Sequence, residues 1–145
     1  MHVDFETIGT IHSPYKTTGE IPRQSIYSQD KQAVLELSEA LTEGLVGYEP
    51  GDYMMIFFYF HQSKSYKLKQ IPGKNHVFKE PGKERGVFAI RSPHRPNGIG
   101  LSIVKIVKIE KNRITFEGVD MLDQTPVLDI KPYIENLNPE SGSIE

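Results

Sequence analysis

The sequence has no cysteine, which excludes disulfide bonds, thiolate nucleophiles and zinc sites built on cysteine. We expect no metal centre. The chain also lacks any apolar run near the roughly 20 residues that a membrane-spanning helix needs, since its longest, residues 53–60, has the length of a strand. Residues 1–9 carry acidic side chains and no apolar signal core, which favours a cytoplasmic location over export.

A Gly-rich loop between a strand and a helix is missing too, and a Rossmann-type nucleotide site would need one. The sequence contains no internal repeat. Any chemistry therefore has to come from another kind of site.

Length and composition favour a single globular domain. The 145 residues can bury one continuous core but not two independent ones. Hydrophobic residues make up 37% and charged residues 25%, proportions that exclude a disordered chain. We expect one domain over residues 1–135 and a polar tail over 136–145.

The net charge of −2 conceals a basic central segment, residues 61–95. This segment has nine lysines and arginines against two glutamates, a net charge of +7, while eight basic and seventeen acidic residues elsewhere give −9. Two interpretations stay open, a surface that attracts an anion and a solvated lysine-rich loop. The nine basic residues are Lys64, Lys67, Lys69, Lys74, Lys79, Lys83, Arg85, Arg91 and Arg95.

Short apolar runs predict a mainly β fold. Several of them alternate with a period of two, and turn residues separate them, which is typical of a closed β-barrel or a sandwich with six or seven strands. Apolar residues at helical spacing, with Ser38 as a possible N-cap, predict one short helix over residues 38–45. The expected strands are residues 6–12, 33–37, 53–61, 86–90, 101–110, 113–119 and 127–130.

The segment that we call the arginine turn, residues 91–100, interrupts two expected strands with two prolines and two glycines. Prolines fix the backbone and glycines allow its close approach, so Arg91, His94, Arg95 and Asn97 are offered as donors in a fixed geometry. Such a turn suits a carboxylate or phosphate ligand. The alternative is a tight connection whose arginines pair with acidic residues of the same chain.

Residues 88–102 (FAIRSPHRPNGIGLS) resemble the signature of the TrmO-type tRNA methyltransferases. Four further segments resemble motifs of that family in the same order, so the similarity extends from Ile8 to Tyr133. Five ordered motifs are far more specific than one. The further segments are residues 8–16 (IGTIHSPYK), 22–24 (PRQ), 58–61 (FYFH) and 120–133 (DMLDQTPVLDIKPY).

The resemblance implies a small all-β barrel that forms a homodimer and binds S-adenosylmethionine near the subunit interface. It implies methylation of N6 of a threonylcarbamoyl-modified adenosine beside the tRNA anticodon. The expected cofactor is therefore S-adenosylmethionine and the expected partner is tRNA.

The resemblance also implies which residues contact the cofactor. An adenosine favours apolar side chains, the methionine carboxylate a guanidinium, and the sulfonium an aromatic face or a carboxylate. For Tyr15 and Tyr53, packing in the core is the alternative. The implied cofactor contacts are Ser13, Pro14, Tyr15, Tyr53, Arg91, Leu101, Asp120, Met121 and Leu122.

Four other residues are candidates for orienting the substrate, namely Arg23, Gln24, Arg95 and Asn97. Each could equally be structural. Positioning should dominate the reaction, because the methyl donor is already activated by its positive charge. No general base is assigned.

The sequence departs from the family at three places. Asp52-Tyr53 stands where the family often has a Ser-His pair, Gly98 stands where it usually has proline, and the segment before Gly86 is shorter. Many members also continue with a carboxy-terminal domain, so the sequence resembles a short form. Two alternatives therefore stay open, a methyltransferase with a small molecule or another RNA as acceptor, and a non-catalytic module that binds S-adenosylmethionine or RNA.

Overall fold

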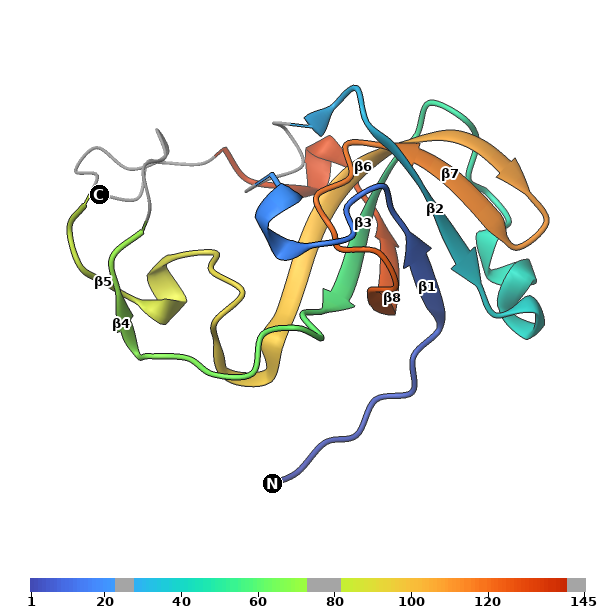
Figure 1. Cartoon of the computed structure of the whole chain (residues 1–145). Helices are drawn as coiled ribbons and strands as arrows, with labels where there is room; N and C mark the ends of the chain where they lie inside the picture. Colours follow the sequence, from blue (N-terminus) through green and yellow to red (C-terminus); the bar gives the residue numbers. More distant parts are fainter. Residues whose placement is uncertain (23–27, 73–81, 141–145) are drawn as a thin grey trace.

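The structure is a computed structural model that describes residues 1–22, 28–72 and 82–140. Six antiparallel strands close into a barrel in the order β1-β2-β7-β6-β3-β8 (Figure 1). The mainly β fold and the six-stranded barrel expected from the sequence are confirmed. The strands are β1 (Gly9–His12), β2 (Gln32–Leu37), β3 (Tyr53–Tyr59), β6 (Ile99–Glu110), β7 (Arg113–Glu117) and β8 (Pro126–Pro132).

Period-two alternation builds the core of the barrel. Along β6, outward residues from Ile99 to Lys105 are exposed, whereas the inward residues between them are buried. Because successive side chains point to opposite faces of a strand, the inward set of every strand meets in one closed core. The largest fully buried members are Phe116, Ile11, Leu35, Met54, Ile56, Ile106, Ile114 and Met121.

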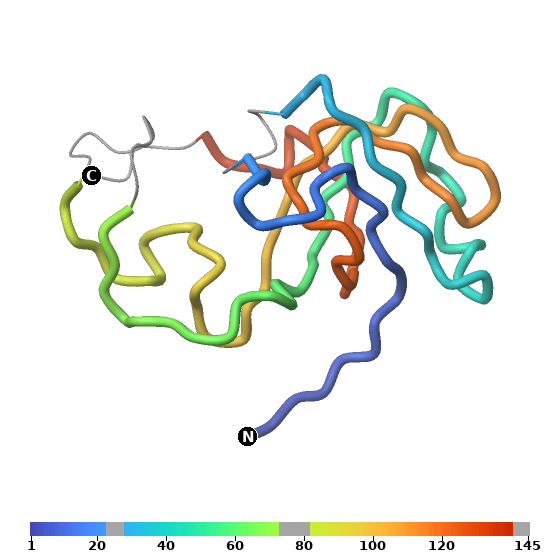
Figure 2. The backbone as a smooth tube through the Cα atoms, viewed as in Figure 1, coloured from blue at the N-terminus to red at the C-terminus, as the bar shows by residue number. Residues whose placement is uncertain are grey.

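The chain between β3 and β6 leaves the barrel wall (Figure 2). It forms a small two-stranded sheet from β4 (Lys69–Gln70) and β5 (Arg85–Gly86), followed by the 3₁₀ turns η4 (Val87–Ala89) and η5 (Pro96–Gly98). Figure 1 shows this excursion beside the barrel, and the arginine turn is its last part.

The strand predicted for residues 86–90 is wrong. Only Arg85–Gly86 pair with another strand, and η4 follows at once. Val87 and Ile90 are buried while Phe88 between them is 78% exposed. Burial at positions three apart is the spacing of a turn and not of a strand, although the composition alone is typical of either.

The predicted helix forms as the seven-residue 3₁₀ helix η3 (Glu39–Leu45). Leu45 is its only buried residue, so it has no apolar face to stabilise a longer α-helix. Ser38 occupies the N-cap position, but its side chain makes no capping hydrogen bond.

The tail predicted for residues 136–145 starts within the turn η6 (Glu135–Leu137), and residues 141–145 lie outside the described part. In the described residues, no helix has the length and apolar character needed to cross a membrane.

Candidate functional site

A cavity of 710 Å³ opens where the arginine turn, the end of β3 and the loop after β7 meet. Its lining is mostly apolar, with a few charged or polar side chains, which is typical of a small-molecule site. Among the lining residues are Phe58, Phe60, Ser63, Phe88, Ile90, Arg91, Pro93, Arg95, Leu101, Ile103, Asp120, Met121 and Leu122.

Two phenyl rings at the end of β3 form one wall. Phe58 and Phe60 pack edge to face with ring centroids 5.1 Å apart. A Cβ atom at Gly100 would lie 2.5 Å from Cζ of Phe58 and 2.8 Å from Cζ of Phe60. Only glycine lets β6 run this close to the rings, as expected for a glycine at a close backbone approach.

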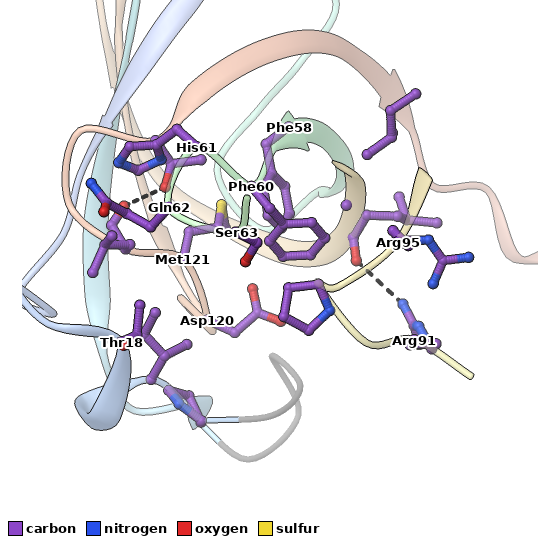
Figure 3. Close-up of a pocket in the computed structure, with 18 of the residues that line it drawn as sticks. Thr18, Phe58, Phe60, His61, Gln62, Ser63, Arg91, Arg95, Asp120 and Met121 are labelled. Atoms are coloured by element: carbon purple, nitrogen blue, oxygen red, sulfur yellow. Dashed lines mark hydrogen bonds between the residues drawn. The ribbon is translucent and has the colours of Figure 1, made fainter. Parts of the chain in front are cut away.

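Asp120 brings a carboxylate to the lining. Its Oδ1 accepts a hydrogen bond of 2.5 Å from Oγ of Ser102, which is only 1% exposed. Figure 3 shows Asp120 among the lining residues, with Arg91 and Arg95 to one side. The cavity therefore offers a carboxylate and two guanidinium groups, which complement a ligand that carries both signs of charge.

The two arginines of the turn are held by backbone oxygens. Nη2 of Arg91 donates to the carbonyl oxygen of Leu101 at 3.2 Å. Nη1 of Arg95 donates to the carbonyl oxygens of Ile90 at 2.9 Å and Ser92 at 3.3 Å. Neither arginine forms an ion pair within the described part of the chain, so the predicted alternative of pairing with acidic residues is wrong there.

Asn97 lies within η5 with φ of 66°, a left-handed conformation that asparagine tolerates better than most residues. It is absent from the cavity lining, unlike Arg95. Arg23 and Gln24 lie outside the described residues.

Ser13, Pro14 and Tyr15 are absent from the lining of this cavity. Ser13 and Pro14 instead line a second pocket of 470 Å³, together with Lys16 and Asp123. The backbone N–H of Ser13 donates to Oδ1 of Asp123 at 2.8 Å, and the N–H of Asp123 donates to the carbonyl oxygen of Tyr15 at 2.8 Å. Lys16 pairs with Oδ2 of Asp123 at 2.9 Å. These contacts brace the turn that carries Asp120, Met121 and Leu122 into the cavity.

Opposing effects act on the carboxyl group of Asp123. Burial alone would raise its pKa, but hydrogen bonds from the Lys16 ammonium and the Ser13 N–H outweigh burial and hold the pKa below its ordinary value. The charged form of Asp123 therefore stabilises the brace.

Tyr53 lies at the far end of β3, where it is 47% exposed and packs against Tyr133 with ring centroids 6.4 Å apart. Phe58 follows five positions later, about 17 Å along an extended strand. Within one chain, Tyr53 is therefore not brought to the cavity.

The site thus unites Arg91, Leu101, Asp120, Met121 and Leu122 from two distant parts of the sequence. Sequence interpretation missed the contribution of aromatic side chains. The signal was present in residues 58–61, where an aromatic run continues to the end of a strand. Among the described residues, no group of three or more His, Asp or Glu side chains is placed to hold a metal ion. The missed aromatic lining residues are Phe58, Phe60 and Phe88.

Comparison with protein families gives a match to the tRNA-methyltransferase O N-terminal domain (TrmO_N) over residues 10–138. An S-adenosyl-L-methionine-binding protein of Archaeoglobus fulgidus is 37% identical over 128 residues, which cover 87% of this chain and 86% of that protein. A probable S-adenosyl-L-methionine-binding protein of Pyrococcus abyssi is 36% identical, covering 90% of this chain and 67% of that protein.

The tRNA (adenine(37)-N6)-methyltransferase of Rattus norvegicus is 36% identical over 94% of this chain, which spans only 33% of that enzyme. Among solved structures, TrmO from Pseudomonas aeruginosa aligns with a TM-score of 0.78 at 35% identity, covering 97% of this chain and 60% of that one. The chain belongs to the tRNA-methyltransferase O N-terminal domain family.

Proposed function

We propose that the cavity binds S-adenosylmethionine and that the protein transfers the methyl group to N6 of a threonylcarbamoyl-modified adenosine beside a tRNA anticodon. The observation that carries this proposal is the meeting of the arginine turn and residues 120–122 in one cavity of 710 Å³. The names of the relatives, which include S-adenosyl-L-methionine-binding proteins and tRNA methyltransferases, support it.

The lining residues fit the chemistry of this donor. Arg91 is exposed at the rim with a guanidinium that can bind the methionine carboxylate. Leu101, Met121 and Leu122 provide apolar contact for the adenosine. The carboxylate of Asp120 and the phenyl rings provide the negative charge and the π faces that attract a sulfonium.

When bound, S-adenosylmethionine supplies an electrophilic methyl group. The protein's own contribution is to hold donor and acceptor in line and to exclude water, both of which the apolar lining favours. Asp120 is engaged by Ser102, and we assign no side chain as general base.

The other cofactor and substrate contacts predicted from the sequence are supported by different observations. The cofactor contacts predicted for Ser13, Pro14 and Tyr15 stay proposals, supported by the hydrogen bonds of Ser13 and Tyr15 to Asp123 in the turn that carries residues 120–122. Arg95 holds the arginine turn while facing the cavity. The substrate contacts predicted for Arg23, Gln24, Arg95 and Asn97 stay proposals. So do the single domain over residues 1–135 and the cytoplasmic location.

We also propose a homodimer, supported by an apolar stripe on the outward face of β3 and β6. This stripe consists of Met55, Phe57 and Tyr59 paired in register with Ile103, Leu101 and Ile99. Leu101 and Ile103 line the cavity as well, so a second copy on the stripe would lie beside the cofactor site. In a dimer, Tyr53 of one subunit would be able to lie near the cofactor bound by the other.

A second candidate keeps the cofactor and changes the acceptor. The chain spans only 33% of the rat tRNA methyltransferase, whereas it spans 86% of an Archaeoglobus protein that is named for S-adenosyl-L-methionine binding alone. If this chain acts as a short form of the family, it uses a small molecule or another RNA as the acceptor, or it binds S-adenosylmethionine without catalysis.

Calorimetry with S-adenosylmethionine tests the site, comparing the native chain with Arg91→Ala. We expect binding to weaken roughly 10- to 150-fold, because a hydrogen bond to a charged group contributes about 1.5–3 kcal/mol. Arg113→Ala, at an exposed position outside the cavity, is the matched control and should bind normally. Equal affinities for all three proteins would contradict the proposed site.

Transfer of labelled methyl from S-adenosylmethionine tests the reaction, with threonylcarbamoyl-modified tRNA and a small-molecule extract as separate acceptors. Label in the tRNA supports the proposal. Label in the small-molecule fraction alone supports the second candidate, and binding without transfer to either supports a non-catalytic module.

A further inference from the structure

The two-stranded sheet of β4 and β5 contributes no side chain to the lining of the cavity. We infer that its outer surface, which we call the β4–β5 platform (residues 64–71 and 82–88), docks RNA with unstacked bases. This inference rests on the proposed function, because it names the surface that would hold the substrate of the neighbouring cavity.

Positive charge is the first observation. Lys64, Lys67 and Lys69 are all exposed within one stretch of six residues. None of the three forms an ion pair within the described residues. Unpaired ammonium groups at this spacing complement the phosphates of a nucleic acid backbone.

Exposed aromatic and apolar side chains stand among the lysines. Phe88 is 78% exposed and Tyr66 is 51% exposed, and Leu68 and Ile71, on either side of β4, are also open to solvent. Exposed aromatic rings beside lysines form the kind of surface on which bases stack, while the lysines follow the backbone. A lipid surface could use the same side chains, and the test below includes it as a separate outcome. The hydrogen bonds that fix this surface beside the cavity favour RNA, the substrate that we propose for that cavity.

The platform is fixed to the cavity by hydrogen bonds. Nε2 of Gln70 donates to the carbonyl oxygen of His94, in the arginine turn, at 2.6 Å and to that of Lys67 at 2.8 Å. The N–H of Val87 donates to the carbonyl oxygen of Leu68 at 2.8 Å. A ligand held on the platform is thereby held at a set place relative to the arginine turn.

Phe88 links the two surfaces because it lines the cavity and is also exposed at its rim. Its neighbours Val87 and Ile90 are buried and anchor the turn beneath it. A ring presented in this way can stack on a base that enters the cavity or on its neighbour. Phe88 is therefore assigned as a substrate-positioning residue.

The test measures binding of a fluorescent anticodon stem-loop RNA by anisotropy over a series of salt concentrations. The variant Lys64→Ala/Lys67→Ala/Lys69→Ala should reduce the slope of log affinity against log salt by about 2, at roughly 0.7–0.9 for each lost phosphate contact. Phe88→Ala should weaken binding roughly 5- to 150-fold without changing the slope. Phe88→Tyr should restore binding.

Matched controls separate docking from folding and from general charge. Lys105→Ala removes an exposed lysine of β6 outside the platform and should leave the slope unchanged. The triple variant should keep the native affinity for S-adenosylmethionine, since none of its three lysines lines the cavity.

The outcomes also separate this inference from the proposed function. Native slope and affinity in the triple variant and in Phe88→Ala would overturn the platform, even if methyl transfer to tRNA occurs. Loss of RNA binding in these variants supports the platform, even if no methyl transfer is found. Binding of the native chain to vesicles of anionic lipid but not to RNA would assign the surface to a membrane and overturn the inference.

Discussion

A single carboxylate joins the first strand of the barrel to the wall of the cavity. Asp123 accepts from the N–H of Ser13 and pairs with Lys16, and its pKa is lowered although burial opposes this. Its contribution to stability should therefore depend on pH in a direction that can be derived.

We expect Asp123→Asn to lower the free energy of unfolding by about 1–3 kcal/mol at pH 7, as for hydrogen bonds to charged groups. The folded pKa lies below the unfolded value of about 3.9, so the native contribution is fully present above that value and is lost as pH falls through the folded pKa. The difference between native and variant proteins should therefore shrink from pH 6 to pH 3, which urea unfolding at each pH measures. Asp30→Asn, an exposed change of the same charge, is the control. A difference that grows towards acid pH would contradict this account.

The sequence predicted individual site residues best where few residue types can fill the role. The glycine at position 100 and the arginine at 91 stand out in the sequence, and the structure places both in the cavity wall. Ser13 and Tyr15 hydrogen-bond to Asp123 and do not line the cavity. The sequence could not predict these contacts, because hydrogen bonds between segments more than 100 positions apart leave no local pattern. Their proximity only becomes visible once the barrel is closed.

At the scale of elements, the strands of the barrel were predictable and the excursion was not. The period of two in the sequences of β6 and β7 predicts strands with one buried face, and their burial patterns confirm this. Residues 86–90 have the composition of a strand but find only a two-residue partner in β4. Pairing partners, which composition does not specify, decide between a strand and a turn.

The arginine turn yields a prediction at this scale. Asn97 has φ of 66°, so Asn97→Ala should lose about 1 kcal/mol of stability, whereas Asn97→Gly should stay within about 0.5 kcal/mol of the native protein. If the amide also orients the substrate, as we propose, Asn97→Gly should transfer methyl several-fold more slowly. Thermal unfolding and methyl transfer measure the two effects. Native activity in Asn97→Gly would leave Asn97 a purely conformational role.

At the scale of the whole molecule, the apolar stripe on β3 and β6 bears on assembly. Tyr59, Ile99, Leu101 and Ile103 are each between 36% and 43% exposed. Contiguous apolar patches on a protein surface commonly mark an interface. The uninterrupted apolar run over residues 53–60 is typical of a strand that is covered on both faces, and in β3 it provides the outward Met55, Phe57 and Tyr59.

We expect the native chain to sediment as a dimer and Phe57→Glu to sediment as a monomer, because a buried unpaired charge opposes association. Phe57 pairs in register with Leu101 at the centre of the stripe. Leu137→Glu makes the same change at a site that is 75% exposed and lies outside the stripe, and it should stay dimeric. A native monomer at micromolar concentration, or a dimeric Phe57→Glu, would refute the proposed interface.

The bare backbone at Gly100 has a consequence for changing what the protein accepts. Because the two phenyl rings rest against main chain at Gly100, β6 has no side chain there that a substitution could shorten. Room for a bulkier donor analogue has to come from shortening other side chains of the lining, such as Leu122 or the rings themselves. Redesign of selectivity in this barrel therefore has a fixed side and an adjustable one.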